Sequence, residues 1–166
     1  GKTPREAVKE TLGIHFKGKP NQGSAFFYKA IQCLNASGVI GCIIPSSLLT
    51  FDAYNSLRNA AYDLITINLI GKLGNFVFED ALTDVSLIVG NKPKTEFMPT
   101  ILWTVNEKEI VQESLRSLRK MDYSNSSTVN EKYYSIFQPA TFPIIPESWK
   151  PISLKENELL KTIERF

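Results

Sequence analysis

The chain has 166 residues, of which 43% are hydrophobic and 22% are charged, and its formal net charge is +2. This length is enough for one domain with a real core, and the composition is ordinary for a soluble globular protein. The charge neither requires nor excludes a polyanionic partner. Pro45, Asp63 and Asn68 interrupt the longest apolar stretches, which excludes a membrane span.

The first part of the chain predicts two helices and a strand. Residues 1–23 are rich in Gly, Pro and Lys and indicate a loop with a short helix at residues 5–12. An apolar stripe then predicts a helix that Ser24 could cap and that ends near Leu34. Residues 39–44 are continuously apolar and are closed by Pro45, a pattern typical of a central parallel strand buried on both faces.

The next segments predict a helix at residues 51–63, followed by strands at residues 64–70 and 85–89. The segment between these two strands leaves no room for a crossover helix, so we expect them to be antiparallel. A short strand at residues 101–105 and a helix at residues 107–120 follow. We expect the strand at residues 39–44 to lie beside that at residues 85–89, with the one at residues 64–70 beyond it.

The last part of the chain is less regular. Residues 122–130 are polar and predict a mobile loop, and four prolines within residues 133–151 predict an extended connector. Ser153 and Glu156 have the spacing of a capping box, which predicts a final helix that continues to the last residue, Phe166.

Several short motifs have structural explanations. Gly1-Lys2-Thr3 matches the end of a P-loop, but the strand and the earlier glycine that shape this anion site do not precede it. His15 is the single histidine, and no Gly-x-Ser-x-Gly nucleophile motif occurs. Cys33 and Cys42 have apolar neighbours and are expected to be buried free thiols in a reducing cytoplasm. We therefore expect no metal site and no catalytic residue in this chain.

Two phenylalanines between the predicted antiparallel strands are the best candidates for a binding role. Phe76 and Phe78 lie in a loop at the expected open end of the sheet. An aromatic ring in such a loop either packs on the local core or offers a surface to a planar ligand. We expect the first for Phe76 and the second for Phe78, because stacking a base on an aromatic ring contributes about 1–3 kcal/mol.

The order of these motifs resembles the later part of adenine-N6 DNA methyltransferases of bacterial restriction–modification systems. The resemblance covers residues 21–90. It rests on the stretch from Asn21 to Phe26, the Gly-containing strand followed by Pro45-Ser46-Ser47, the pair Leu57-Arg58, and the Phe-x-x-Ala-x-x-Asp pattern from Phe78 to Asp84. The family often has Tyr where this chain has Gly23. In relatives, the Phe of the last pattern stacks on the flipped target adenine, which points to Phe78, with Phe76 as a decoy.

This resemblance implies an α/β fold: a partial Rossmann-like methyltransferase sheet made of the late strands, mixed parallel and antiparallel, with flanking helices. The family binds S-adenosylmethionine and transfers its methyl group with an Asn/Asp-Pro-Pro-Tyr/Phe loop, but no Asn-Pro or Asp-Pro pair occurs here. The resemblance therefore implies a fragment that begins shortly after the catalytic loop and is inactive alone. Residues 1–122 would belong to the catalytic domain and residues 123–166 would lead toward a target-recognition domain.

The implied partners are double-stranded DNA and the missing N-terminal half of the catalytic domain. The strand edge from Val39 to Ile44 would pair with that half, and in the isolated chain we expect it to form a dimer or to pack against another part of the chain. Two alternatives stay open. The chain could be a non-catalytic DNA-binding or assembly module, or a fragment of an RNA methyltransferase.

Overall fold

The computed structural model describes residues 1–17, 21–78, 83–121, 128–143 and 148–163. The α-helices are α1 (Pro4–Leu12), α2 (Gln22–Cys33), α3 (Ser47–Thr50), α4 (Asn55–Leu64), α5 (Lys108–Lys120) and α6 (Leu154–Ile163). Two 3₁₀ helices are η1 (Gly13–His15) and η2 (Asp52–Tyr54). The strands are β1 (Val39–Pro45), β2 (Thr66–Gly74), β3 (Val85–Asn91), β4 (Thr100–Thr104), β5 (Val129–Asn130) and β6 (Tyr134–Phe137).

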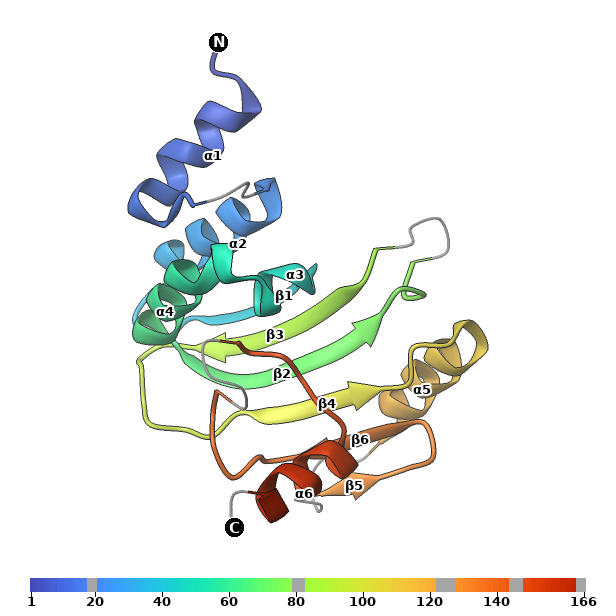
Figure 1. Ribbon diagram of the computed structural model, residues 1–166. Coiled ribbons are helices and arrows are strands. Elements are labelled where there is room, and N and C mark those ends of the chain that lie inside the picture. The colour runs from blue at the N-terminus through green and yellow to red at the C-terminus, as the bar shows by residue number, and fades with distance from the viewer. Residues whose placement is uncertain (18–20, 79–82, 122–127, 144–147, 164–166) are drawn as a thin grey trace.

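One six-stranded mixed sheet, in the order β1-β3-β2-β4-β6-β5, organises the molecule (Figure 1). Strand β3 is antiparallel to both β1 and β2, and β4 is parallel to β2. The order β1-β3-β2 and the antiparallel pairing of β2 with β3 confirm the sequence-based prediction. A parallel β2–β4 pair needs a crossover, and the segment between β3 and β4 supplies it.

Strand β1 corrects the expectation of a strand buried on both faces. Ile40 and Ile44 are buried, but Val39 and Ile43 are 70% and 51% exposed. The strand forms one edge of the sheet and is antiparallel to its neighbour, rather than central and parallel. The exposure of Val39 and Ile43 shows that one face of this apolar strand is not covered by other described residues.

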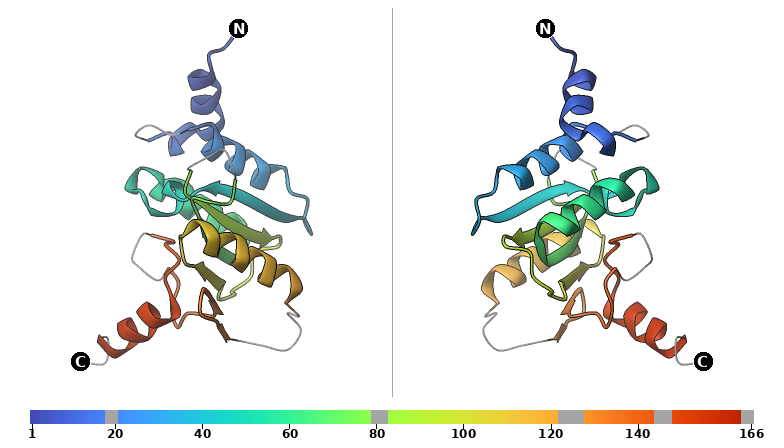
Figure 2. Two further views of the ribbon diagram at one scale, coloured as in Figure 1. Left: turned by 90° about the vertical axis from the view of Figure 1, so that its right-hand side faces the viewer. Right: turned by 90° about the vertical axis from the view of Figure 1, so that its left-hand side faces the viewer.

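Two apolar cores lie on opposite faces of the sheet, because neighbouring residues of one strand point in opposite directions. Helices α1, α2 and α4 pack on the larger core, whose sheet residues include Ile70, Ile88 and Ile101. Helix α5 contributes Leu118 to the smaller core, which contains Leu102 of β4. Figure 2 shows α1 and α6 projecting at opposite ends of the molecule.

The C-terminal part of the chain also enters the sheet and the core. Strand β6 pairs antiparallel with β4, with Trp103 opposite Ser135. Trp149 and Ile152 are buried in the larger core. The expected connector at residues 133–151 therefore contains a strand and a buried segment, although residues 144–147 lie outside the described parts. Of the expected loop at residues 122–130, the structure describes residues 128–130, and β5 lies among them.

The helix boundaries follow local capping chemistry. Asn21, not Ser24, caps α2: its side-chain oxygen accepts a hydrogen bond from the Ser24 N–H at 2.9 Å. The expected helix at residues 51–63 is divided into η2 and α4, and the short helix α3 precedes it, with Phe51 in extended conformation between α3 and η2. The capping box of Ser153 and Glu156 is confirmed, since each accepts a hydrogen bond from the backbone N–H of the other.

Membrane insertion through a helix finds no support in the described residues. None of their helices combines the length and the apolar character that a bilayer crossing requires.

Candidate functional site

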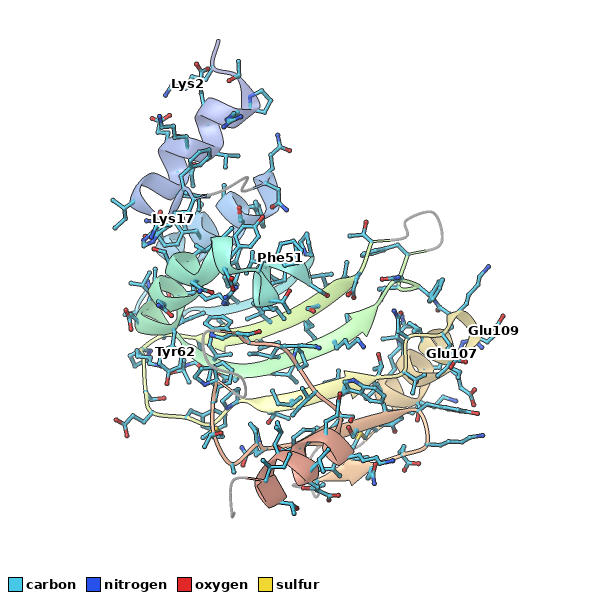
Figure 3. The ribbon with its side chains drawn as sticks, in the orientation of Figure 1. Lys2, Lys17, Phe51, Tyr62, Glu107 and Glu109 are labelled. Carbon is cyan, nitrogen blue, oxygen red and sulfur yellow. The ribbon has the colours of Figure 1, made fainter. Side chains whose placement is uncertain are left out.

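The candidate site lies where strands β1, β2 and β4 end. Both β1 and β2 run opposite to β3, and β4 runs with β2, so the three carboxyl ends point to one side of the sheet (Figure 1). Ligands of open α/β sheets bind outside the carboxyl ends of their strands. The same side carries the segment between β2 and β3 and the start of α5, which Glu107 and Glu109 mark in Figure 3.

A glycine fixes the path of the chain from β2 toward Phe78. Gly74 has φ +83°, and a Cβ atom there would lie 2.2 Å from Oδ1 of Asn106. That oxygen accepts a hydrogen bond from the Asn75 N–H at 2.8 Å. One turn into α5, Gln112 donates from Nε2 to the carbonyl oxygen of Phe76 at 2.7 Å. The segment that carries both phenylalanines, residues 75–78, is called the limb here, and it is attached to α5 and to the segment before α5.

The two phenylalanines differ in exposure. Phe76 is partly buried, whereas 48% of Phe78 is exposed. A half-exposed ring at the carboxyl ends of the strands can offer one of its faces to a planar ligand. Residues 79–82 of the Phe-x-x-Ala-x-x-Asp pattern lie outside the described residues, so the stacking role of Phe78 stays a prediction.

A cavity of about 380 Å³ opens beside this limb, on the face that carries the larger core. Its floor is made by two cross-strand neighbours, Ser86 of β3 and Lys72 of β2. The other lining residues come from the turn after β1, from the start of β3 and from the segment before α6: Pro45, Ser46, Ser47, Leu49, Thr50, Phe51, Thr83, Asp84, Lys150 and Pro151. Figure 3 shows Phe51 beside α3, above the sheet.

A buried arginine holds the turn that forms one wall of the cavity. Arg58 of α4 is 1% exposed and donates hydrogen bonds from Nη1 to the carbonyl oxygens of Leu48 and Phe51, both at 2.9 Å. It also donates from Nη2 to the side chain of Asn55. The planar guanidinium satisfies several acceptors at once. Arg58 of the Leu57-Arg58 pair thus has a clear structural role in shaping the cavity.

A second set of hydrogen bonds closes the cavity from the other side. The backbone N–H of Trp149 donates to the carbonyl oxygen of Leu49 at 2.9 Å. On the rim, the Ser46 hydroxyl lies 3.0 Å from Oδ1 of Asp84 and 2.7 Å from the hydroxyl of Ser86. The Ser46 N–H also donates to the Asp84 carbonyl oxygen. This polar cluster links the end of β1 to the start of β3.

Two lysines bring positive charge to the cavity. The ammonium group of Lys72 lies 5.6 Å from the centre of the Trp103 ring, on the neighbouring strand. Lys150 is exposed on the segment before α6. Hydrogen bonding from the backbone of Ser153 lowers the pKa of Glu156 below its usual 4.5, and the charges of Lys150 and Lys72 act in the same direction. The two cations are therefore close enough to act on one carboxylate.

The remaining sequence motifs have structural roles. Thr3 caps α1 in a capping box with Glu6, and Lys2 forms an ion pair with Glu10 at 2.5 Å. Nδ1 of His15 lies 2.7 Å from the Ser56 hydroxyl. The tripeptide that matches the end of a P-loop therefore begins a helix, and the single histidine bonds to α4.

The expectation for the cysteines is half right. Both are free thiols, but Cys33 is exposed and Cys42 is only partly buried, so neither is a core residue. Partial burial raises the pKa of the Cys42 thiol. No group of three or more His, Cys, Asp or Glu side chains in the described part of the chain could hold a metal ion.

Sequence reasoning missed the cavity and its lysines. Ser46 and Ser47 belonged to a recognised motif, but Lys72 and Lys150 are far apart in the sequence and match no motif. Their proximity depends on the cross-strand register of β2 and on the path of the segment before α6. A lysine inside the otherwise apolar end of β2 is the single sequence signal that could have marked the site.

No protein-family model matches the chain, and no curated protein matches it in sequence. Solved structures match it in fold. The type IIG restriction endonuclease BpuSI matches 96% of this chain with a TM-score of 0.54 and 14% sequence identity, over 18% of its own chain. This likeness shows a shared fold, and the mixed six-stranded sheet with flanking helices is consistent with a methyltransferase-like fold.

Two weaker matches are methyl-transfer components of restriction systems. A type I restriction-modification system methyltransferase subunit from Streptococcus thermophilus has a TM-score of 0.47 and 13% identity, over 80% of this chain and 31% of that one. The M protein of the type I restriction enzyme EcoKI has a TM-score of 0.43 and 14% identity, over 51% and 19%. The chain thus spans less than a third of the length of each of these proteins.

Proposed function

We propose that this chain is the C-terminal part of the catalytic domain of a DNA adenine-N6 methyltransferase from a restriction–modification system. The motif order over residues 21–90 supports this proposal, as does the fold shared with BpuSI. The observation that carries it is the half-exposed ring of Phe78 at the carboxyl ends of β1 and β2. The parent protein would act on double-stranded DNA.

In this proposal the chain supplies the surface that receives the target base. Enzymes that modify a base inside a duplex first extrude it into a pocket. Phe78 would stack on the extruded adenine and hold it, with a contribution of about 1–3 kcal/mol. Gly74 and Asn106 would act as positioning residues, since they set the direction of the limb that carries Phe78.

The methyl donor would be bound by other parts of the parent protein. S-adenosylmethionine carries a positive sulfonium, which lysine ammonium groups repel. The cavity lined by Lys72 and Lys150 therefore does not fit the reactive part of this cofactor. The sequence also has no Asn/Asp-Pro-Pro loop, so we propose that the chain alone does not methylate DNA.

The division of labour along the chain is part of the same proposal. Residues 1–122 would complete the catalytic domain, and residues 123–166 would lead toward a target-recognition domain. Because β6 pairs with β4, the second part would begin inside the sheet before it leaves it. Helix α6, which projects from the sheet, is the element that would continue toward the recognition domain (Figure 2).

Replacing Phe78 with Ala in the full-length protein tests the stacking role. We expect kcat/KM for DNA adenine methylation to fall by about 5- to 150-fold, the equivalent of about 1–3 kcal/mol. Phe76→Ala is the matched control, because the two rings are two residues apart and Phe76 is the more buried. Methyl transfer from labelled S-adenosylmethionine, with a fluorescent base analogue to report extrusion, measures both steps.

The result separates the proposal from its alternatives. Loss of methylation in Phe76→Ala together with full activity in Phe78→Ala would show that Phe76, not Phe78, is the stacking ring. Methylation of RNA but not of DNA would change the substrate class. A full-length protein that binds DNA and methylates neither substrate would instead be a non-catalytic module.

A further inference from the structure

Two cations line the cavity, and the Glu156 carboxylate, on which both act, lies beyond ion-pair distance of either. Lys72 and Lys150 both line it, and neither has a carboxylate within 4.0 Å among the described residues, where the ion pair present is that of Lys2 with Glu10. The ammonium of Lys72 lies over the ring of Trp103, and the Asp84 carboxylate on the rim accepts a hydrogen bond from the Ser46 hydroxyl. Two ammonium groups that line one cavity favour an anionic ligand there.

The other polar atoms of the cavity are mainly hydroxyls. Ser46, Ser47, Thr50 and Thr83 line it together with the lysines, and hydroxyl groups can donate hydrogen bonds to an anion. Ser86 and the Asp84 carboxylate complete the polar lining, and the apolar walls are Pro45, Leu49, Phe51 and Pro151. A ligand that fits this lining carries a negative group for the lysines and a less polar part for the walls.

The size and position of the cavity further limit which ligands it could bind. Its volume of about 380 Å³ is at the small end of ligand pockets. Thr83 and Asp84 line it on the far limb of the β2–β3 connection, whose near limb carries Phe78, but Phe78 itself is not a lining residue. A base on Phe78 would therefore lie outside the cavity, and the sugar and phosphate next to that base are the parts that could reach inside.

We propose that this cavity binds the DNA backbone next to the base that stacks on Phe78, with Lys72 and Lys150 as the phosphate contacts. This inference rests on the function proposed above. The hydroxyls of the rim donate to phosphate oxygens, and the apolar walls pack against the deoxyribose. The site holds the strand beside the extruded nucleotide, because Thr83 and Asp84 line the cavity on one limb of the β2–β3 connection whose other limb carries Phe78.

Salt dependence of DNA binding tests this assignment. The full-length protein is titrated with a fluorescent single-stranded adenine-containing oligonucleotide at salt concentrations between about 50 and 200 mM. A single strand is used because its nucleotides can reach the cavity without the free-energy cost of unpairing and unstacking from a duplex. Each phosphate contact contributes about 0.7 to the slope of log K against log salt, so Lys72→Met and Lys150→Met should each lower the slope by that amount.

Matched variants separate charge from packing. Methionine keeps the aliphatic stem over Trp103 and removes the charge, while Lys72→Arg retains the charge and should retain the slope. Lys9→Met, at an exposed position of α1 that does not line the cavity, is the control and should leave the slope unchanged. Equal slopes for wild type and both cavity variants would overturn the proposal, as would an equal decrease in Lys9→Met.

The Phe78→Ala variant tests the stacking role separately from the phosphate site. Loss of a stacking ring should weaken binding at every salt concentration without changing the slope, because no counterion is released by stacking. Unchanged affinity in Phe78→Ala with reduced slopes in the lysine variants would refute the stacking role and support the phosphate site. The reverse result would refute the phosphate site alone.

Discussion

At the scale of single residues, Gly74 has the most specific requirement. Its φ of +83° is unfavourable for residues with a side chain, and an added Cβ would overlap the side-chain amide of Asn106. We expect Gly74→Ala to lower the free energy of unfolding of the chain by about 1–3 kcal/mol, measured by urea denaturation. In the full-length protein the same change should also reduce methylation, because the limb that carries Phe78 would shift.

Gly41 provides the matched control for this prediction. It lies in β1 with open space around its Cα, and a Cβ there would meet no atom within 4 Å. Gly41→Ala should change the free energy of unfolding by less than about 1 kcal/mol. If the two alanine variants had the same stability, the strained turn at Gly74 would have no energetic role.

The residue scale is also where sequence reasoning was least complete. Phe78 was a candidate because its motif is local in the sequence, within one loop. Lys72 was missed because its importance depends on its neighbours Ser86 and Trp103, which only the strand register brings beside it. Cys33 was predicted to be buried from its apolar neighbours, but it is the last residue of α2 and is exposed.

At the scale of elements, we expect the stability of the first turn of α6 to depend on pH. Hydrogen bonds from the backbone N–H and the hydroxyl of Ser153 lower the pKa of Glu156 below 4.5. A carboxyl whose pKa is lower in the folded state stabilises the fold above its unfolded pKa, and this contribution disappears as the pH falls through the folded pKa. We therefore expect the first turn of α6 to fray as the pH falls below 4.5 and through the lowered pKa of Glu156, with faster amide hydrogen exchange.

Substitutions at the capping box provide the controls for this pH dependence. Glu156→Gln should remove it, and Ser153→Ala should speed exchange at every pH, at a cost of about 1 kcal/mol. Glu158→Gln, in the same helix but outside the capping box, should leave the profile unchanged. A profile that persists in Glu156→Gln would mean that another group titrates.

The elements predicted correctly are those with long local patterns. Helix α5 and the pair β2–β3 follow from periodicity and from turn residues that the sequence displays directly. Strand β6 was missed because four residues among prolines resemble a connector, and it forms because β4 offers a free edge. The exposed face of β1 could not be predicted, since an apolar run has the same composition whether its second face is covered or not.

At the scale of the whole molecule, the open edge of β1 determines how the chain can associate. The carbonyl of Gly38 accepts a hydrogen bond from the N–H of Lys92, and the N–H of Ser46 donates to the carbonyl of Asp84. The backbone groups of the even-numbered residues along β1 therefore point toward β3. Alternation along the strand then directs the backbone groups of Val39, Gly41 and Ile43 to the open edge. Within the described residues β1 pairs with β3 alone, and its edge carries neither a lysine nor a bulge that would hinder pairing.

This edge complements a second copy of itself in antiparallel orientation. With Gly41 opposite Gly41 on a two-fold axis, Val39 of each copy lies opposite Ile43 of the other, and four exposed apolar side chains meet on one face. We expect the isolated chain to form a weak dimer in sedimentation equilibrium. Gly41→Pro should abolish it, because proline removes an outward N–H that β3 does not use, whereas Gly41→Ala should retain it. Adding the N-terminal half of the catalytic domain should dissociate the dimer, since both would compete for one edge. An isolated chain that stays monomeric at every concentration would refute the prediction that this edge drives association.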